Sequence, residues 1–206
     1  MDAPLLVVVT GMPSSGKTTI ATALAERLRL PLVAKDDLKE SLFETLGHGD
    51  VAWSGRLGDA AYDLMFALAR TMLAARVPLI VEANFFAGQA TRFITLPEHR
   101  LVQIHCDAPL AVLLERYAAR ERHPGHNDGE KIKELPARHA SGAHAPLDVP
   151  GETIRLDTSE PVDVATLAES LRARHLAAAP ASEPQTEGDE PRKPRSRSRL
   201  RRYPCR

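Results

Sequence analysis

Residues 5–28 read LLVVVTGMPSSGKTTIATALAERL and join three patterns that together decide the fold. Leu5–Val9 is an unbroken apolar run rich in valine, which is typical of a strand buried on both faces in a parallel sheet. Gly11 and Gly16 then frame a short loop. After the loop, large apolar residues recur every four positions, which predicts an amphipathic helix that ends before Pro31. The stretch therefore predicts a strand, a glycine loop and a helix in direct succession.

The loop fits the pattern G-x-x-x-x-G-K-[S/T], which indicates phosphate binding when it lies between a strand and a helix. Successive backbone N–H groups of such a loop point at phosphate oxygens, and the positive end of the helix dipole adds to the attraction. We expect Lys17 to reach the β and γ phosphates and the Thr18 hydroxyl to ligate Mg²⁺. The predicted nucleotide contacts are Gly11, Pro13, Ser14, Ser15, Gly16, Lys17, Thr18 and Thr19. A chance glycine turn before a helix is the alternative.

Strands and helices continue to alternate along the rest of the chain. The predicted strands are 32–34, 78–82, 101–106 and 153–157, and the predicted helices are 37–46, 57–76, 109–122 and 164–179, with a short helix ending near residue 96. Glycine-rich residues 47–58 and polar residues 123–151 show no sustained periodicity, so we predict loops there, with one helical turn at 130–135. This alternation predicts an α/β fold, a three-layer sandwich in which a parallel five-stranded sheet has helices on both faces.

Composition and charge divide the chain into two parts. It has 206 residues, of which 43% are hydrophobic and 26% charged, as in an ordinary globular protein. Residues 192–206 contain eight basic residues and no acidic one, and residues 1–180 keep a net charge of −4. That mild acidity argues against a broad nucleic-acid-binding face on the folded part. We predict a domain at 1–179 and a disordered tail, rich in Pro and Glu and then in Arg, at 180–206.

Cysteine content and hydropathy indicate the compartment. Cys106 and Cys205 are the only cysteines, which provides neither a disulfide framework nor a cysteine zinc site. The first apolar run is too short for a signal peptide, and no stretch approaches the ~18 apolar residues of a membrane span. We therefore expect a cytoplasmic protein that has no membrane partner. The oligomeric state stays open.

The order of the motifs resembles the small P-loop kinases that include chloramphenicol phosphotransferase, zeta toxins, and the shikimate and gluconate kinases. The likeness covers residues 5–177 and rests on the glycine loop, on KDDLK at 35–39, on VEANF at 81–85 and on LDTS at 156–159. Only the loop is highly specific alone. The resemblance implies the P-loop NTPase fold, which AAA-type ATP-binding proteins share, with a lid at about 116–150. It also implies ATP with Mg²⁺ as cofactors, and a small-molecule hydroxyl as acceptor of the γ-phosphate.

Acidic residues directly follow the second predicted strand. The carboxyl ends of parallel strands face the crevice where ligands bind, and an alcohol that attacks a phosphate must lose its proton. The resemblance implies Asp36 as the base, because Asp36-x-x-Lys39 is similar to the Asp-x-x-Arg/Lys pattern of these kinases, with the Lys39 cation near the acceptor. Asp37 is the alternative base. Either aspartate could instead cap the following helix.

Two polar residues lie at the end of the third predicted strand. Glu82 occupies the position of the Walker-B-like acid of many P-loop proteins, which implies a role as a metal ligand or as an acceptor contact. Aspartate is more usual there, and glutamate leaves both roles open. Asn84 could hydrogen-bond the acceptor or be a satisfied turn residue.

Arginines mark the start of the predicted lid. Arg116 and Arg120 are four residues apart on the helix predicted at 109–122, so both should project from one face. The resemblance to adenylate-kinase-like enzymes implies that they close over the nucleotide and neutralise charge on the transferred phosphoryl group, an effect worth about 10³–10⁵ in rate. A solvated helix face is the alternative. The resemblance also places Thr158 beside the adenine, in a segment where main-chain contacts dominate.

Three functions are consistent with these motifs. The first is an ATP-dependent kinase of a small-molecule hydroxyl. The second is a polynucleotide kinase or a zeta-toxin-like kinase of a nucleotide sugar, which the basic tail keeps open. The third is a nucleotide-dependent ATPase switch without any acceptor. Trp53 could stack on an acceptor or anchor its loop, and the histidines of the predicted lid lack the further ligands that a zinc site needs.

Overall fold

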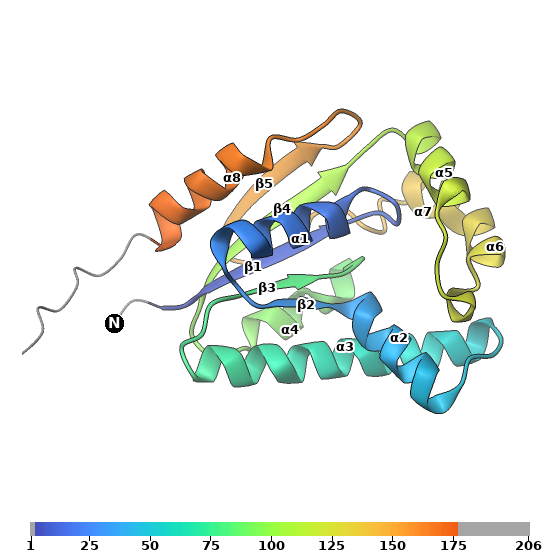
Figure 1. Ribbon diagram of the computed structural model, residues 1–206, viewed down its shortest axis with the longest axis horizontal. Helices are drawn as coiled ribbons and strands as arrows, with labels where there is room; N and C mark the ends of the chain where they lie inside the picture. The colour runs from blue at the N-terminus through green and yellow to red at the C-terminus, as the bar shows by residue number, and fades with distance from the viewer. Residues whose placement is uncertain (1–2, 177–206) are drawn as a thin grey trace, which may run out of the picture.

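The computed structural model describes residues 3–176 and consists of a parallel β-sheet between two layers of helices (Figure 1). The five strands lie in the order β2-β3-β1-β4-β5, and every neighbouring pair is parallel. They are β1 (Leu5–Gly11), β2 (Leu32–Ala34), β3 (Leu79–Glu82), β4 (Arg100–Asp107) and β5 (Glu152–Asp157). The predicted α/β class, the strand number and the P-loop NTPase architecture are confirmed.

The helices connect the strands in the expected order. They are α1 (Lys17–Leu28), α2 (Lys35–Leu46), α3 (Val51–Ala74), α4 (Ala90–Ile94), α5 (Leu110–Ala119), α6 (Asp128–Lys131), α7 (Leu135–Ala140) and α8 (Val164–Leu171). Shorter turns are η1 (Ala87–Gln89), η2 (Pro124–His126), η3 (Ile132–Glu134) and η4 (Arg172–Leu176), the last of which continues α8. The expected end of the last helix and the expected disordered tail lie outside the described residues. Within residues 3–176, no helix combines the length and apolarity that crossing a bilayer requires.

Side chains that alternate along β1 divide the core between the two faces of the sheet. Leu5, Val7 and Val9 pack in one apolar cluster with α1 and α8, and Leu6 and Val8 pack in a second with α3 and α4. All five are at most 1% exposed. Because both faces are covered, the strand needs no polar positions, which explains its unbroken apolar run.

The register of the sheet brings the predicted site motifs together. Glu82, at the end of β3, pairs with Val9 of β1 on one side and with Ala34 of β2 on the other. The glycine loop follows β1, and α2 follows β2. Glu82 therefore lies between the loop and the first turn of α2, at the carboxyl edge of the sheet.

Residues 47–58 do not form the irregular loop that their glycines predicted. Most of them belong to α3, because the Asp50 carboxylate caps that helix by accepting a hydrogen bond from the Trp53 backbone N–H at 2.8 Å. Gly58 is buried inside the helix and faces the Lys39 side chain of α2. The Trp53 indole donates to a backbone carbonyl at the turn between these helices, 2.9 Å away.

The helix after β4 ends before Arg120, earlier than the predicted end near Arg122. Arg120 has the extended backbone angles φ −79° and ψ 139°, so Arg116 and Arg120 do not share a helical face as predicted. The chain must already be extended just before Pro124, because proline disfavours a helical residue ahead of it. From there it turns across the end of α2.

Residues 123–151 contain short helices where a polar loop with one helical turn was predicted. Each of η2, α6, η3 and α7 has only three to six residues, too few for an apolar period to appear in the sequence. The segment is held by Leu135, which is 1% exposed and packs with Met12, Leu113 and Tyr117. This apolar cluster fixes the segment, which we call the lid (residues 120–140), against α5 and the glycine loop.

Candidate active site

The glycine loop curls around a space beyond the carboxyl end of β1. Ser14 and Gly16 have positive φ angles of 65° and 78°, which turn the backbone back on itself. Gly11 has φ 144°, and a Cβ there would lie 2.1 Å from the Cys106 carbonyl oxygen on β4, so this position requires glycine. Within the described chain, the buried Ser15 hydroxyl has no hydrogen-bond partner. The loop thus has the curvature of a phosphate cradle.

The nucleotide-proximal cavity, of about 360 Å³, lies along this loop. Five residues of the loop predicted for nucleotide binding line it, namely Ser14, Gly16, Lys17, Thr18 and Thr19. Two other predicted contacts lie elsewhere. Gly11, the last residue of β1, packs against the Cys106 carbonyl of β4, and Pro13 lines the neighbouring cavity described below.

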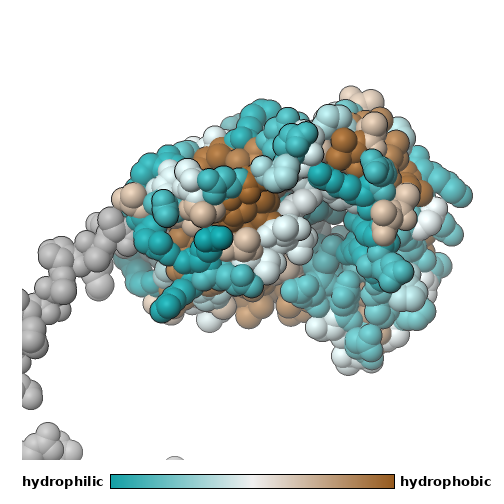
Figure 2. All heavy atoms as spheres, turned by 45° about the horizontal axis from the view of Figure 1, so that its top comes forward, coloured by the Kyte–Doolittle hydropathy of each residue, from teal (hydrophilic) through white to brown (hydrophobic). Residues whose placement is uncertain are grey.

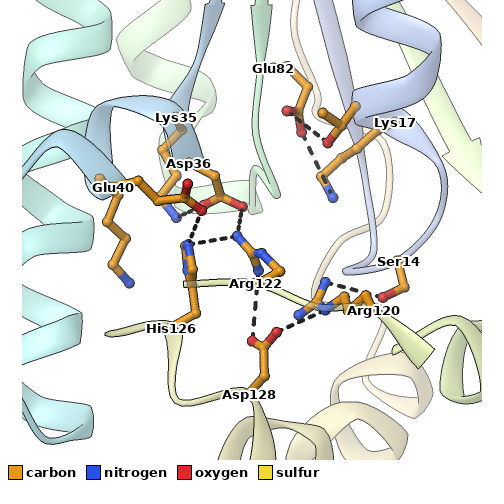
Figure 3. A network of polar contacts seen from close by, with 12 residues as sticks. Ser14, Lys17, Lys35, Asp36, Glu40, Glu82, Arg120, Arg122, His126 and Asp128 are labelled. Atoms are coloured by element: carbon orange, nitrogen blue, oxygen red, sulfur yellow. Dashed lines mark hydrogen bonds and ion pairs between the residues drawn. The ribbon is translucent and has the colours of Figure 1, made fainter. Parts of the chain in front are cut away.

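Lys17 and Thr18 line the nucleotide-proximal cavity, and both side chains contact the buried Glu82 behind them. Figure 3 shows Lys17 beside Glu82. The Thr18 hydroxyl donates to Glu82 Oε2 at 3.2 Å, and Lys17 Nζ lies 3.9 Å from Glu82 Oε1. Burial raises the pKa of the Glu82 carboxyl and lowers the pKa of Lys17, although each charge partly stabilises the other. A hydroxyl beside a carboxylate supplies the oxygen ligands that Mg²⁺ prefers. These residues therefore fit a nucleotide-bound Mg²⁺.

Asp36 lies in the first turn of α2 and is surrounded by positive charge (Figure 3). Its carboxylate accepts a hydrogen bond from Lys35 Nζ at 2.7 Å and forms a close ion pair with Arg122. Burial alone would raise the pKa of Asp36, but the charges of Lys35 and Arg122 outweigh that effect and hold the pKa well below its usual range. The carboxylate is ionised at neutral pH.

Neither aspartate of this turn caps α2. The N-cap position is Ala34, and no side chain accepts a capping hydrogen bond there. Asp37 lies outward on the same turn, and burial together with the nearby Glu40 and Asp36 carboxylates raises its pKa. Asp36 is thus the aspartate that meets the lid and lines both cavities, while Asp37 lines the nucleotide-proximal cavity but not the acceptor cavity described below.

Arg116, Arg120 and Arg122 contact three different parts of the site. Arg120 Nη1 donates to Ser14 Oγ in the glycine loop at 3.2 Å, and its Nε donates to Asp128 Oδ2 at 2.9 Å. Asp128 also lies 3.7 Å from Arg122 Nη1, so one carboxylate holds both arginines (Figure 3). Arg116, on α5, instead donates to the backbone carbonyl oxygen of the predicted adenine segment at 2.7 Å. No helical periodicity marks Arg122 or Asp128, because Arg122 lies beyond the end of α5 and the helix that begins at Asp128 has only four residues.

A second cavity of about 320 Å³, which we call the acceptor cavity, lies between α2, α3 and the lid. The predicted substrate residues Asp36, Lys39 and Asn84 line it, whereas Glu82 does not. Asp36, Asn84, Arg120 and Arg122 line both this cavity and the nucleotide-proximal one. Figure 2 shows the surface hollowed between the body that contains the sheet and a lobe at the right of the view. Most of the residues on the surface of that lobe are hydrophilic. Trp53 is not among the lining residues.

Thr158 lies at the opposite end of the site, after β5. Its hydroxyl is 2.8 Å from the Ser15 carbonyl oxygen and 2.8 Å from the Asp107 carbonyl oxygen, so the side chain ties the glycine loop to β4. A further cavity of about 430 Å³ is lined by Gly16, Thr19, Ile20, Arg116, Thr158, Ser159, Glu160, Pro161 and Val162. It has the place and the partly apolar lining that an adenine would need.

Comparisons with known proteins agree with this geometry. Residues 6–141 match the AAA domain family, a span that includes the glycine loop, α2 and the lid. The chain is similar to a solved structure from Chloroflexus aurantiacus that is provisionally named a kinase, with 35% identity and a TM-score of 0.75 over 84% of this chain and 99% of that one. It also shares its fold with a sugar kinase from a Janibacter species, with 24% identity and a TM-score of 0.54 over 87% and 98%. No curated protein matched the sequence.

The chain therefore belongs to the AAA domain family. Within it, the fold, the glycine loop and the named neighbours place the chain among the small P-loop kinases, as its motifs predicted.

Proposed function

We propose that the protein is a kinase that transfers the γ-phosphate of ATP to a hydroxyl group of a small molecule. The observation on which this rests is the place of Asp36, whose side chain lines both the nucleotide-proximal cavity and the acceptor cavity. A carboxylate at that junction can accept a hydrogen bond from an alcohol and aim its oxygen at the γ-phosphorus. A nucleotide switch would not need a second cavity that opens onto the same aspartate.

The donor half of the site would hold the triphosphate. The backbone of the glycine loop and Lys17 would bind its β and γ oxygens, and Thr18 with Glu82 would hold Mg²⁺, which neutralises charge on those oxygens when bound. Arg120 already reaches the loop at Ser14, and Arg122 lies at Asp36. Both guanidinium groups are therefore close to the path that the phosphoryl group would follow between the two cavities.

The state of Asp36 indicates how it would act. A carboxylate paired with Lys35 and Arg122 is a weak base, as its lowered pKa shows. Phosphoryl transfer passes through a loose transition state, in which the attacking alcohol keeps its proton until bonding to phosphorus is advanced. Asp36 would thus orient the hydroxyl first and take its proton as the new O–P bond forms and the bond to ADP breaks.

A transfer screen with γ-labelled ATP tests the proposal. The panel covers sugars, sugar acids, sugar phosphates, nucleosides and oligonucleotides, with Lys17→Ala as the blank. We expect one small-molecule class to accept label, and Asp36→Asn to lower kcat by about 10²–10⁴ with little change in nucleotide affinity. Asp37→Asn is the matched control on the same turn and should keep most of the activity.

Two results would overturn the proposal. One is ATP turnover that no acceptor stimulates and that Asp36→Asn leaves unchanged, as expected for an ATPase switch. The other is label transfer to oligonucleotide ends alone, with affinity that falls steeply with salt, as expected for a polynucleotide kinase.

A further inference from the structure

The charges that line the acceptor cavity do not balance. Each of its three carboxylates is engaged by a cation that also lines the cavity, in the pairs Lys35–Asp36, Arg120–Asp128 and Arg138–Glu134. Arg122 shares the first two of these carboxylates. The two lining cations that remain are Lys39 and Lys131. Among residues 3–176, no carboxylate lies within the 4.0 Å of an ion pair from either ammonium group.

Lys39 and Lys131 converge on one neutral group. Lys39 Nζ donates to Ser54 Oγ at 2.8 Å, and Lys131 Nζ donates to the same oxygen at 3.1 Å. Ser54 is completely buried and Lys39 is 3% exposed. Two ammonium groups thus meet at a hydroxyl that carries no charge to offset theirs.

This arrangement is costly without a further ligand. Buried charges in proteins are normally paired, because removal from water is not otherwise compensated. Burial, together with the charges of Lys35 and Lys131, lowers the pKa of Lys39 to about 7, and burial also lowers the pKa of Lys131. An anion held between the two lysines would supply the missing negative charge.

We propose that Lys39, Lys131 and Ser54 form an oxyanion subsite, and that the acceptor is a small alcohol that also carries a carboxylate or phosphate group. This inference rests on the kinase function proposed above. Asp36 and Lys39 are three residues apart on α2, so their Cβ atoms are roughly 5–6 Å apart on one helical face. The phosphorylated hydroxyl and the oxyanion would therefore be separated by only a few bonds. A cavity of about 320 Å³ is large enough for such a molecule.

The two lysines also come from different parts of the molecule. Lys39 belongs to α2, beside the sheet, and Lys131 ends α6 in the lid. An oxyanion between them would connect the lid to the body of the protein. Binding of the anion would then also position the lid arginines.

Direct binding tests the subsite without any need for turnover. With the glycine loop saturated by Mg²⁺ and a non-hydrolysable ATP analogue, sulfate is titrated into the full chain by calorimetry. We expect binding that weakens at least tenfold in Lys39→Met and in Lys131→Met, which keep the side-chain volume and remove the charge. Lys133→Met is the matched control, because Lys133 is exposed in the same segment and lines neither cavity.

Lys131 is only partly buried, so its variant should fold even if Lys39→Met does not. Circular dichroism and the affinity for the ATP analogue establish that each variant is intact. Sulfate that fails to bind, or that binds equally well to Lys131→Met and to the wild-type chain, would overturn the subsite.

Matched acceptors separate this inference from the kinase function. The sets are glycerol, glycerate and glycerol 3-phosphate, and glucose, gluconate and glucose 6-phosphate. We expect kcat/KM at least tenfold higher for an anionic member than for its neutral counterpart, with Lys131→Met removing that preference through KM. Transfer that favours the neutral members would refute the subsite and leave the kinase function intact. Sulfate binding that depends on both lysines, without transfer to any alcohol in the wider screen, would support the subsite and refute the kinase function.

Discussion

Two buried lysines of this site are in contrasting electrostatic situations. Lys17 has the Glu82 carboxylate 3.9 Å away, whereas Lys39 contacts two uncharged groups, the Ser54 hydroxyl at 2.8 Å and the Phe43 ring, whose centroid is 5.2 Å away. A buried charge without a counter-ion costs folding free energy, and such costs are typical of residues that are kept for binding. The free energy of unfolding of the ligand-free protein should therefore change when Lys39 is substituted.

Lys39→Met should raise the free energy of unfolding of the ligand-free protein by about 1–3 kcal/mol, because an apolar chain of similar volume replaces an unpaired charge. The gain should depend on pH. The folded-state pKa of about 7 lies below the 10.5 of an unperturbed lysine, so the unfolded chain binds more protons between these values and wild-type stability rises with pH there. The advantage of the variant should be full below pH 7 and shrink at higher pH.

Urea unfolding of both proteins on either side of pH 7 measures this difference. Lys35, Asp36, Arg122 and Lys131 also act on Lys39 and are present in both proteins, so the comparison isolates the substituted side chain. A variant that is less stable than wild type at every pH would show that the lysine is well compensated in the free protein.

At the scale of elements, the lid is positioned by its packing on α2. The imidazole of His123 stacks on the Phe43 ring with centroids 5.0 Å apart, and His126 meets the same ring edge-on at 5.4 Å. Gly125 lies between them, where a Cβ would be 2.8 Å from His48 Cβ and 2.9 Å from the Phe43 ring. The lid approaches α2 this closely because residue 125 has no side chain.

Gly125→Ala should push the lid away from α2 and displace Arg122 from Asp36. We expect a loss of stability of about 1–3 kcal/mol from overpacking, together with a fall in the rate of phosphoryl transfer. Gly129→Ala is the matched control four residues on, because no atom lies within 4 Å of a Cβ placed there. It should be neutral or slightly stabilising, since alanine favours a helix by up to about 1 kcal/mol over glycine. Thermal unfolding and steady-state kinetics are measured for both variants. Equal stability and equal rates in the two would contradict close packing at Gly125.

Elements could be predicted from the sequence where their determinants are local. The buried strands and the glycine loop are encoded in runs of a few residues. The donor half of the site is built on that loop, so it could be predicted for the same reason. The start of α3 was missed because glycines outweighed the capping signal of Asp50. The acceptor half depends on contacts distant in sequence: Ser54 meets Lys131 across 77 positions, and Asp36 meets Arg122 across 86. No periodicity or spacing in the chain encodes such pairs.

In the whole molecule, the three cavities described above follow one another along the carboxyl edge of the sheet, from the β5 side to the β2 side. The cavity beside Thr158 is followed by the one along the glycine loop and then by the acceptor cavity. In an open parallel sheet, ligands bind at this edge, in the crevice where the strand order reverses. The lid touches both the loop, through Arg120, and the acceptor cavity, through Lys131.

This geometry predicts that nucleotide and anionic acceptor bind with positive coupling. Both ligands would contact the lid, so the ligand that binds first favours the lid position that the second ligand also needs. We expect each to tighten the other by about 5–150-fold, or about 1–3 kcal/mol. Calorimetry with the ATP analogue and glycerate, titrated in both orders, measures the factor. Linkage requires the same value from both orders, which gives an internal check.

Asp128→Asn identifies the lid as the source of that coupling. Asp128 holds Arg120 at 2.9 Å and Arg122 at 3.7 Å, yet belongs to neither the glycine loop nor the lysine pair. The substitution keeps the shape of the side chain and removes the charge that fixes both arginines. If the lid transmits the effect, the coupling should shrink toward unity while each ligand still binds alone with nearly its wild-type affinity. Coupling that persists in full in this variant would mean that the two sites communicate through Asp36 and the sheet instead.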